Sequence, residues 1–451
     1  MGCFIMITRT STYSNKTVTY DILGDLKVEL KIQENPYDIP LEELFVMAAR
    51  INKKRSFLFV SKVLGKHIPI RPAKGILGGS LLAARYMQVV KESTPIDLEP
   101  ILSQFLKEEP SVTYESFINE KSNPVIIGFA ETATALGHAF FESFAYADYF
   151  HTTREWLEGV KPAITFEEEH SHATSHRAYI NETLLNSSRE VILVDDEITT
   201  GKTALNIIRS IHSNYPRSTY TVVSILDWRS GENVDRFKQL EKELGIIIHT
   251  VSLIKGTVNV LGTVNGMNEE IEGHIDFDTP QKITFLPIKN PSLFTLGTNN
   301  NPYTLFTGRF GLSSQENVEA AKWISEVGKF LASVRSGTKT LVLGTGEYMY
   351  LPMKIASHMG ENVFYHSTTR SPIYPVQKDN YGAKNRYSFK NPEDLTVQNF
   401  VYNITQNQYD DIFIFFERKI EKESLCELLD QLKATKIKNI NIVYIAEKDG
   451  E

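Results

Sequence analysis

The stretch VILVDDEITTGKT, residues 191–203, combines residue types that could bind a phosphorylated sugar. Four apolar residues lead into the carboxylates Asp195 and Asp196, and three threonines and one glycine follow within seven residues. Carboxylates accept hydrogen bonds from vicinal hydroxyls, and a Thr/Gly loop that enters a helix offers N–H groups and hydroxyls to a phosphate. The spacing predicts a sugar-phosphate site, with the two acids at the ribose hydroxyls. The 5-phosphate would lie against Thr199, Thr200, Gly201, Lys202 and Thr203.

Two simpler interpretations explain less of this stretch. A nucleotide-binding P-loop needs a glycine five positions before Gly201, and Asp196 stands there. The acids could instead cap the following helix while the threonines form a turn. Capping accounts for one acid but not for two acids followed by TTGKT.

Length and composition indicate an ordinary globular protein of two or three domains. The chain has 451 residues, 41% hydrophobic and 23% charged, with a formal net charge of −7. The negative charge, without a basic stripe, argues against nucleic acid as a partner. The two cysteines, Cys3 and Cys426, suit neither a disulfide framework nor a zinc site. Since no apolar run approaches the roughly 18 residues of a membrane span, we expect a cytoplasmic protein without a membrane partner.

Short apolar runs alternate with helical patterns, which predicts α/β domains with parallel sheets covered on both faces. The expected strands lie at 57–60, 124–130, 147–153, 191–196, 221–228 and 246–254, and then at 340–344, 362–368, 411–416 and 440–446. The polar interval 91–123 is expected to be a helical insertion. We therefore expect a first domain at 1–260, a linker region at 261–290 and a second domain at 291–451.

An ungapped internal repeat relates the two halves. Residues 125–154 align with 341–370 at an offset of 216, and five identities fall at expected strand ends. The pairs are Gly128 with Gly344, Glu131 with Glu347, and Thr152, Thr153 and Arg154 with Thr368, Thr369 and Arg370. We interpret the second domain as a diverged copy. Because Phe416, Glu417, Arg418 and Lys419 replace the acids and the phosphate loop there, we expect the first domain to be the catalytic one.

The stretch VILVDDEITTGKT resembles the phosphoribosyl diphosphate (PRPP) motif of type I phosphoribosyltransferases. The segments GTGEYMY and STTRSPIYP resemble the TRSP domain, which is fused to such transferases in bacterial tellurium-resistance and stress gene clusters. The resemblance implies a type I phosphoribosyltransferase fold followed by a diverged, phosphoribosyltransferase-like TRSP domain. It implies the use of PRPP to form an N-ribosidic product with release of diphosphate, in the biosynthesis of a nucleoside-like metabolite. A non-catalytic PRPP- or nucleotide-binding regulator is the alternative.

Further site residues follow from the resemblance. Within FLFVSKVLGKH, it places Ser61 and Lys62 in the diphosphate loop, although Gly65 and Lys66 could share that role. Arg154 ends a strand where such enzymes carry a basic residue towards the diphosphate, and Glu131 could take the nucleophile's proton or orient Arg154. Mg²⁺ would be held mainly through PRPP, near Asp195 and Asp196.

Segment 166–179 corresponds to the mobile catalytic loop of the family. There, His170, His172, His176 and Arg177 could neutralise the departing diphosphate. The three histidines could instead bind a metal, or the segment could be a solvated linker. Two positions depart from the usual PRPP motif, since Lys202 replaces a common second glycine and Glu197 a common apolar residue.

The second domain keeps a glycine loop and part of the repeat. We expect it to bind a product, an acceptor or a phosphorylated intermediate through Gly344, Gly346, Glu347, Thr369, Arg370 and Ser371. The GTGE loop could alternatively belong to a nucleotide or methyl-donor site. The expected partners are PRPP, an unidentified small-molecule acceptor and other products of a stress gene cluster. The repeat suggests an internal pseudo-dimer, and a homodimer is the other arrangement expected.

Overall fold

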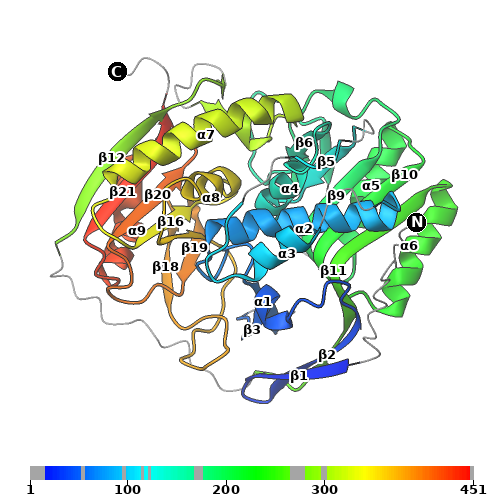
Figure 1. The fold of residues 1–451 in the computed structure, drawn as a ribbon, viewed down its shortest axis with the longest axis horizontal. Helices are drawn as coiled ribbons and strands as arrows, with labels where there is room; N and C mark the ends of the chain where they lie inside the picture. Colours follow the sequence, from blue (N-terminus) through cyan, green and yellow to red (C-terminus); the bar gives the residue numbers. More distant parts are fainter. Residues whose placement is uncertain are drawn as a thin grey trace, which may run out of the picture.

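Two mainly parallel β-sheets organise the chain, with helices between their strands (Figure 1). The computed structural model describes residues 16–51, 56–93, 98–112, 116–119, 123–166, 176–264, 280–295 and 302–446. The α/β class expected from the alternating apolar runs is confirmed. In the described part of the chain, every helix is too short or too polar to cross a membrane.

The first sheet has eight strands in the order β1-β2-β11-β10-β9-β5-β6-β15. The five strands from β11 to β6 are parallel, whereas β1, β2 and β15 extend the edges in antiparallel fashion. The bounds are β1 Lys16–Leu23, β2 Leu26–Glu34, β5 Val125–Gly128, β6 Asp148–His151, β9 Val191–Ile198, β10 Thr219–Asp227, β11 Ile247–Leu261 and β15 Leu312–Ser313.

The second sheet has five parallel strands in the order β12-β21-β20-β16-β17. Its β20, β16 and β17 follow one another as β9, β5 and β6 do in the first sheet, which gives the repeated sequences the same place in both sheets. Strand β12 lies within the stretch expected as a linker. The bounds are β12 Lys282–Lys289, β16 Thr340–Gly344, β17 Val363–Ser367, β20 Asp411–Phe416 and β21 Asn439–Ala446.

Helices and short strand pairs complete the described structure. The helices are α1 Leu41–Leu44, α2 Pro72–Val90, α3 Leu98–Leu106, α4 Ala133–Phe141, α5 Lys202–Asn214, α6 Gly231–Leu244, α7 Ser314–Val334, α8 Tyr350–Ala356 and α9 Cys426–Lys433, with 3₁₀ turns η1 Glu182–Leu184, η2 Leu305–Thr307 and η3 Lys422–Leu425. The short pairs are β3 Phe45–Ala49 with β4 Phe57–Ser61, β7 Ile164–Phe166 with β8 His176–Ala178, β13 Leu293–Phe294 with β14 Tyr303–Thr304, and β18 Arg386–Asn391 with β19 Asp394–Tyr402.

The expectation that FLFV at 57–60 is the first strand of the parallel sheet is wrong. This run lies in β4, which pairs with β3 in antiparallel fashion, outside the eight-stranded sheet. Its apolar residues are explained by aromatic packing, because the ring of Phe59 stacks on Trp228 with centroids 5.2 Å apart and meets Phe45 edge-on. An apolar run shows that a strand is buried but does not say which sheet it joins.

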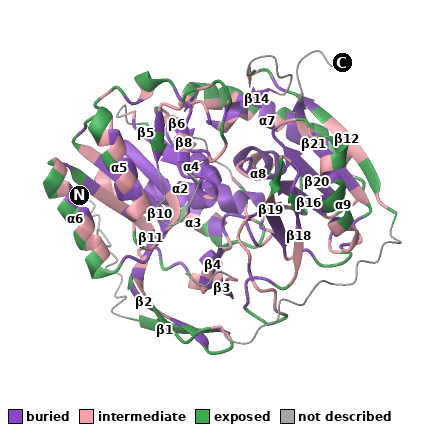
Figure 2. Ribbon diagram, turned by 180° about the vertical axis from the view of Figure 1, so that it is seen from behind, coloured by how far each residue is buried: buried purple, intermediate pink, exposed green. Residues whose placement is uncertain are grey.

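Helices α2, α4 and α8 lie between the two sheets and are mostly buried (Figures 1 and 2). Glycines of α2 permit this close packing. A Cβ added to Gly75 would lie 2.5 Å from Met353 Sδ of α8, and one added to Gly79 would lie 2.5 Å from the Ala139 carbonyl carbon of α4. One hydrophobic cluster therefore contains residues of both halves.

Each half also sends a segment onto the edge strand of the other half. Ile70 and Tyr365 of β17 exchange backbone hydrogen bonds of 2.9 and 2.8 Å, while β15 pairs with β6 through Leu312 and Tyr149. A glycine with a positive φ precedes each of these contacts by a few residues, Gly65 with +67° and Gly308 with +82°. These reciprocal crossings tie the two halves together on both sides.

Candidate active site

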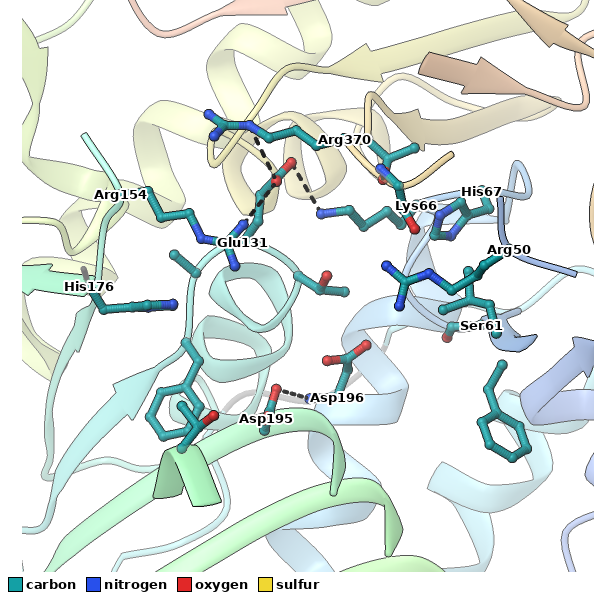
Figure 3. A pocket seen from close by; sticks show the side chains of 18 residues that line it. Arg50, Ser61, Lys66, His67, Glu131, Arg154, His176, Asp195, Asp196 and Arg370 are labelled. Atoms are coloured by element: carbon teal, nitrogen blue, oxygen red, sulfur yellow. Dashed lines mark hydrogen bonds and ion pairs between the residues drawn. The ribbon is translucent and has the colours of Figure 1, made fainter. Parts of the chain in front are cut away.

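A cavity of about 390 Å³ opens at the carboxyl ends of β5 and β9 (Figure 3). Its walls come from both halves of the chain, since they include Asp195, Glu131 and Arg154 of the first half and Arg370 of the second. In open parallel sheets ligands bind at this end of the strands. The sheet therefore directs the chemistry-bearing residues of several distant segments into one space.

The two acids face the cavity because β9 is longer than its neighbour β5. Pairing between these strands ends at Gly128 and Val194, so Asp195 and Asp196 are the next residues along β9. This extends the expected strand, which continues through the acids to Ile198. The Asp195 carboxylate accepts the backbone N–H of Asp196 at 2.9 Å. Burial, followed by the adjacent charge of Asp196, holds the pKa of Asp195 well above its ordinary value.

The loop after β9 delivers the N-terminus of α5 to the same cavity. Gly201 precedes the helix with φ +71°, and no side chain caps the helix there. Thr203, in the first turn, lines the cavity. The first-turn N–H groups and the Thr203 hydroxyl are thus donors for an anion.

Thr199, Thr200 and Lys202 hold this loop without lining the cavity. The Thr199 carbonyl accepts Asn233 Nδ2 at 3.4 Å, and Thr200 Oγ1 accepts the Lys202 N–H at 3.4 Å. Of the residues predicted to hold the phosphate, Thr203 therefore faces the cavity, whereas Thr199, Thr200 and Lys202 shape the turn.

Positive side chains gather at the opposite end of the cavity, around one carboxylate. Glu131, in the loop after β5, lies 3.1 Å from Lys66 Nζ, 3.9 Å from Arg154 Nη1 and 3.9 Å from Arg370 Nε (Figure 3). Burial lowers the pKa of Lys66, and Glu131 opposes that shift. This end is suited to an anion that can accept bonds from several cations at once.

Of the two residues predicted for the diphosphate loop, one lines the cavity. Ser61 does, and its Oγ accepts the N–H groups of Val63 and Leu64 at 3.1 and 3.3 Å. Lys62 instead borders a separate hollow beside Glu43 and Arg71. Lys66, four residues after Lys62, lines the cavity where Lys62 was expected.

The segment 166–179 is only partly described. His170 and His172 lie outside the described residues. His176 is buried on β8, lines the cavity and has Nδ1 2.9 Å from Thr152 Oγ1, which also accepts the Ala130 N–H at 2.9 Å. Arg177 turns away from the cavity, donates to the Arg154 carbonyl at 3.0 Å and lies over the Trp156 ring.

The residues expected to bind a ligand in the second domain divide into two groups. Thr369, Arg370 and Ser371 line the cavity just described, together with the first-domain residues. Gly344, Gly346 and Glu347 do not. The Gly344 carbonyl accepts the Thr368 N–H at 3.0 Å, and the Gly346 N–H donates to Thr368 Oγ1 at 3.1 Å.

Glu347, the counterpart of Glu131 in the repeat, belongs to a buried ion-pair cluster. This cluster occupies the position in the second half that corresponds to the cavity of the first. Glu347 lies 3.1 Å from Arg309 Nη1 and accepts the Arg154 N–H at 2.8 Å. Burial raises the pKa of Glu347, but Arg309, His151 and the hydrogen bond from the Arg154 N–H together outweigh it, so that the pKa is lowered. Arg309 also pairs with Glu417, and Arg418 pairs with Glu155. Two of the residues that replace the acids and phosphate loop in the second half, Glu417 and Arg418, are therefore paired with the protein's own charges.

Sequence reasoning missed Arg50 and His67, which line the cavity, and Phe59 and Phe129, which form its apolar wall. No motif surrounds Arg50. His67 directly follows the Gly65–Lys66 pair, so the quoted segment FLFVSKVLGKH contained the signal. Among the described residues, no three or more His, Cys, Asp or Glu side chains form a group that could hold a metal ion.

Comparison with known proteins assigns both halves to sequence families. Residues 44–257 match the family described as "Phosphoribosyl transferase", and residues 306–432 match the "TRSP domain C terminus to PRTase_2". No curated protein matches the chain.

Solved structures similar to the chain include adenine phosphoribosyltransferases. The Trypanosoma brucei enzyme is 13% identical, with a TM-score of 0.30, over 50% of this chain and 82% of its own. The Rhodothermus marinus enzyme is 16% identical, with a TM-score of 0.21, over 30% and 70%. The Leishmania donovani enzyme is 16% identical, with a TM-score of 0.23, over 29% and 56%.

Proposed function

The chain joins a domain of the phosphoribosyl transferase family to a C-terminal TRSP domain, and on that premise we propose that it is a PRPP-dependent phosphoribosyltransferase. One observation carries the proposal. A single cavity holds two adjacent carboxylates, a helix N-terminus and, at its other end, a cluster of cations. PRPP presents hydroxyls, a 5-phosphate and a diphosphate, and each of these groups has a matching site in the cavity.

In the proposed complex, Asp195 and Asp196 accept hydrogen bonds from the ribose hydroxyls. The N-terminus of α5 and Thr203 hold the 5-phosphate, while Lys66 and Arg154 hold the diphosphate. A bond forms between ribose C1 and the acceptor nitrogen as the bond from C1 to the diphosphate oxygen breaks. The diphosphate leaves with that bond's electron pair, and the proton of the nitrogen passes to solvent. The residues act by positioning and by charge stabilisation, without a covalent intermediate.

Glu131 has the surroundings of a positioning residue. It is buried, with 6% of its side chain exposed, and lies among Lys66, Arg154 and Arg370. A carboxylate that lies among three cations attracts each of them and so restrains where their side chains lie. We therefore propose that it orients Lys66 and Arg154 rather than taking the proton of the nucleophile.

The donor set also fits Mg²⁺ delivered with PRPP. The carboxylate oxygens of Asp195 and Asp196 are hard ligands of the kind Mg²⁺ prefers, and two of them suffice when phosphate oxygens complete the shell. When bound, Mg²⁺ would offset the negative charge that develops on the diphosphate. Asp195 and Asp196 would hold it on the ribose side.

The apolar wall suits a flat acceptor. Leu58, Phe59 and Phe129 line the cavity alongside the polar groups, and aromatic rings stack on planar heterocycles. We propose a heterocyclic base, or a related nitrogen nucleophile, as the acceptor. A nucleoside-like metabolite made in a stress or tellurium-resistance system is the product class that the TRSP resemblance favours.

Diphosphate release tests this function against the regulator alternative. The protein would be incubated with PRPP, Mg²⁺ and a panel of bases that includes adenine, uracil and orotate, as well as a cell extract. We expect release that depends on an acceptor and disappears in Asp195→Asn/Asp196→Asn. Tight PRPP binding without release from any mixture would support the non-catalytic regulator instead.

A further inference from the structure

Among the described residues, the cation-rich end of the cavity holds more cations than carboxylates to balance them. Lys66, Arg154 and Arg370 contribute three positive charges around Glu131, within 3.1 to 3.9 Å. Two of the three belong to the first domain, whereas Arg370 follows β17 of the second. A multiply charged anion would complete this balance.

Arg370 occupies its place because the second half repeats the backbone of the first. The Thr152 N–H donates to the Gly128 carbonyl at 2.9 Å, as the Thr368 N–H does to Gly344 at 3.0 Å. The Glu155 N–H donates to Thr153 Oγ1 at 3.0 Å, just as the Ser371 N–H donates to Thr369 Oγ1 at 3.1 Å.

The two equivalent arginines, Arg154 and Arg370, thus follow equivalent strands. Both reach the same Glu131 oxygen, at 3.9 Å each, from different sides of the cavity (Figure 3). The repeat therefore supplies a pair of arginines to one site rather than one arginine to each of two sites.

Two buried polar atoms beside these cations have no hydrogen-bond partner among the described residues. They are Ser371 Oγ, from the second domain, and His67 Nε2, from the first, and both residues line the cavity. Leaving a buried polar group without a partner is costly, so such atoms mark places where a ligand completes the hydrogen bonding. This observation is independent of the charge count and indicates the same end of the cavity.

The second domain also fixes the loop that carries Lys66. The Gly65 carbonyl accepts the Ser367 N–H at 2.8 Å and lies 2.6 Å from His366 Nδ1, while the His67 carbonyl accepts Asn403 Nδ2 at 2.6 Å. Both ends of the Lys66 backbone are consequently held by second-domain residues. The lysine's position depends on a domain to which it does not belong.

We propose that Arg370 and Ser371 of the second domain bind the diphosphate of PRPP held by the first domain, so that the two domains form one composite active site. The inference rests on the proposed function. Glu131 serves as the internal counter-ion of Lys66, Arg154 and Arg370, and the diphosphate takes over part of its contacts. The second domain acts as a partner subunit within the same chain, and its own equivalent site is closed by the Arg309 cluster.

Binding of the two halves of PRPP, measured separately, tests this proposal. Inorganic diphosphate with Mg²⁺, and ribose 5-phosphate alone, would each be titrated calorimetrically into the full-length protein. In Arg370→Ala we expect diphosphate affinity to fall about 10- to 100-fold, the loss typical of a charge-assisted contact. Ribose 5-phosphate affinity should stay within about twofold, because that ligand contacts the other end of the cavity.

Control variants separate a binding role from a structural one. Arg236→Ala removes an exposed arginine of α6 that pairs with Glu232 within the helix, and it should change neither affinity. Arg370→Lys should recover part of the diphosphate affinity, and Ser371→Ala should weaken diphosphate binding several-fold. These two conservative changes keep the test valid if Arg370→Ala unfolds the protein.

The outcomes distinguish failure of the inference from failure of the proposed function. If the wild-type protein binds both ligands while Arg370→Ala and Ser371→Ala bind diphosphate as tightly as it does, the composite site is wrong and the PRPP site stands. If the wild-type protein binds neither ligand, the proposed function fails, and the composite site fails with it.

Discussion

At the scale of single residues, Asp195 shows a conflict between stability and binding. Two carboxylates on adjacent positions of a partly buried strand repel each other, and the pKa of Asp195 is raised by burial and then by Asp196. In the folded state Asp195 thus keeps its proton to a higher pH than in the unfolded chain. Deprotonation then costs folding free energy, and stability falls as the pH rises from the unfolded pKa towards the folded one. In the proposed complex, the ribose hydroxyls and Mg²⁺ would relieve this cost.

Asp195→Asn should therefore stabilise the protein while abolishing PRPP binding. The amide keeps an oxygen to accept the Asp196 N–H but removes the repulsion. We expect the melting temperature at pH 7 to rise by about 1–2 °C, since the shift per kcal/mol falls with the size of the unfolding unit and this chain is expected to unfold as one. The gain should vanish near pH 4, and Asp235→Asn on the exposed face of α6 should show none. If Asp195→Asn and the wild-type protein melted at the same temperature at pH 7, the proposed repulsion between Asp195 and Asp196 would be contradicted.

Glu131→Gln should tighten diphosphate binding. The change removes the carboxylate that competes with diphosphate for Lys66, Arg154 and Arg370, and we expect a gain of roughly tenfold, equivalent to about 1.4 kcal/mol. It also leaves the buried Lys66 without its counter-ion, at a cost of roughly 3–5 kcal/mol in unfolding free energy. Calorimetric titration and denaturant unfolding measure the two effects. Unchanged or weaker diphosphate binding would contradict the proposed competition between Glu131 and diphosphate for these cations.

Residues that lie close together along the chain were the easiest to place from the sequence. The stretch 191–203 contains its chemistry within thirteen positions, so the arrangement of Asp195, Asp196 and Thr203 follows from one strand and one helix start. Arg50, His67 and Arg370 come from three distant segments. Their convergence depends on packing between the halves, which no local pattern encodes.

At the scale of elements, the turn at Gly201 connects β9 to the N-terminus of α5. Its φ of +71° lies in the region that favours glycine, and an added Cβ would overlap with the ring of Phe237. Phe237 belongs to α6, so this turn also sets how closely α6 approaches α5. The glycine is thus required by conformation and by space.

Gly201→Ala and Gly245→Ala together separate these two requirements. Gly245 ends α6 with a similar φ of +67°, but an added Cβ would meet no atom within 4 Å. We expect Gly245→Ala to cost about 1 kcal/mol of unfolding free energy for the backbone conformation alone. Gly201→Ala should cost about 2–4 kcal/mol, because it adds the steric overlap, and should weaken ribose 5-phosphate binding. Equal costs in the two variants would show that the contact with Phe237 is unimportant.

Element positions were predictable where apolar runs form parallel strands, and less so elsewhere. The runs at 340–344 and 411–416 coincide with β16 and β20. The hairpin β1–β2 was not predicted, although alternation of buried and exposed residues in β2 and a turn at Gly24 with φ +58° provide the signals. The exchanged segments at Gly65 and Gly308 were also missed, because strand exchange between halves is decided by tertiary contacts.

At the scale of the whole molecule, the two halves share one core and exchange edge segments. Ile70 bonds to β17, β15 pairs with β6, and one hydrophobic cluster includes residues of both halves. We therefore do not expect the two domains defined by the sequence to unfold separately. Instead, we expect the halves to depend on each other for folding, as they do in the proposed composite site.

Thermal unfolding should accordingly be a single transition in which calorimetric and van't Hoff enthalpies agree. Arg309→Met leaves Glu347 and Glu417 buried without their shared cation, which should cost roughly 3–5 kcal/mol. We expect the whole transition to move to lower temperature without splitting. Two separate unfolding transitions, of which Arg309→Met shifts only one, would show that the halves fold independently.

A ligand-bound structure with Mg²⁺ and PRPP tests the central claim most directly, because it locates the three chemical groups of PRPP in the cavity. We predict the ribose hydroxyls within hydrogen-bond distance of Asp195 and Asp196, and the 5-phosphate at the first turn of α5. The diphosphate should lie between Lys66, Arg154 and Arg370, with contacts from both domains. PRPP bound with its diphosphate at α5, or bound outside this cavity, would contradict the account.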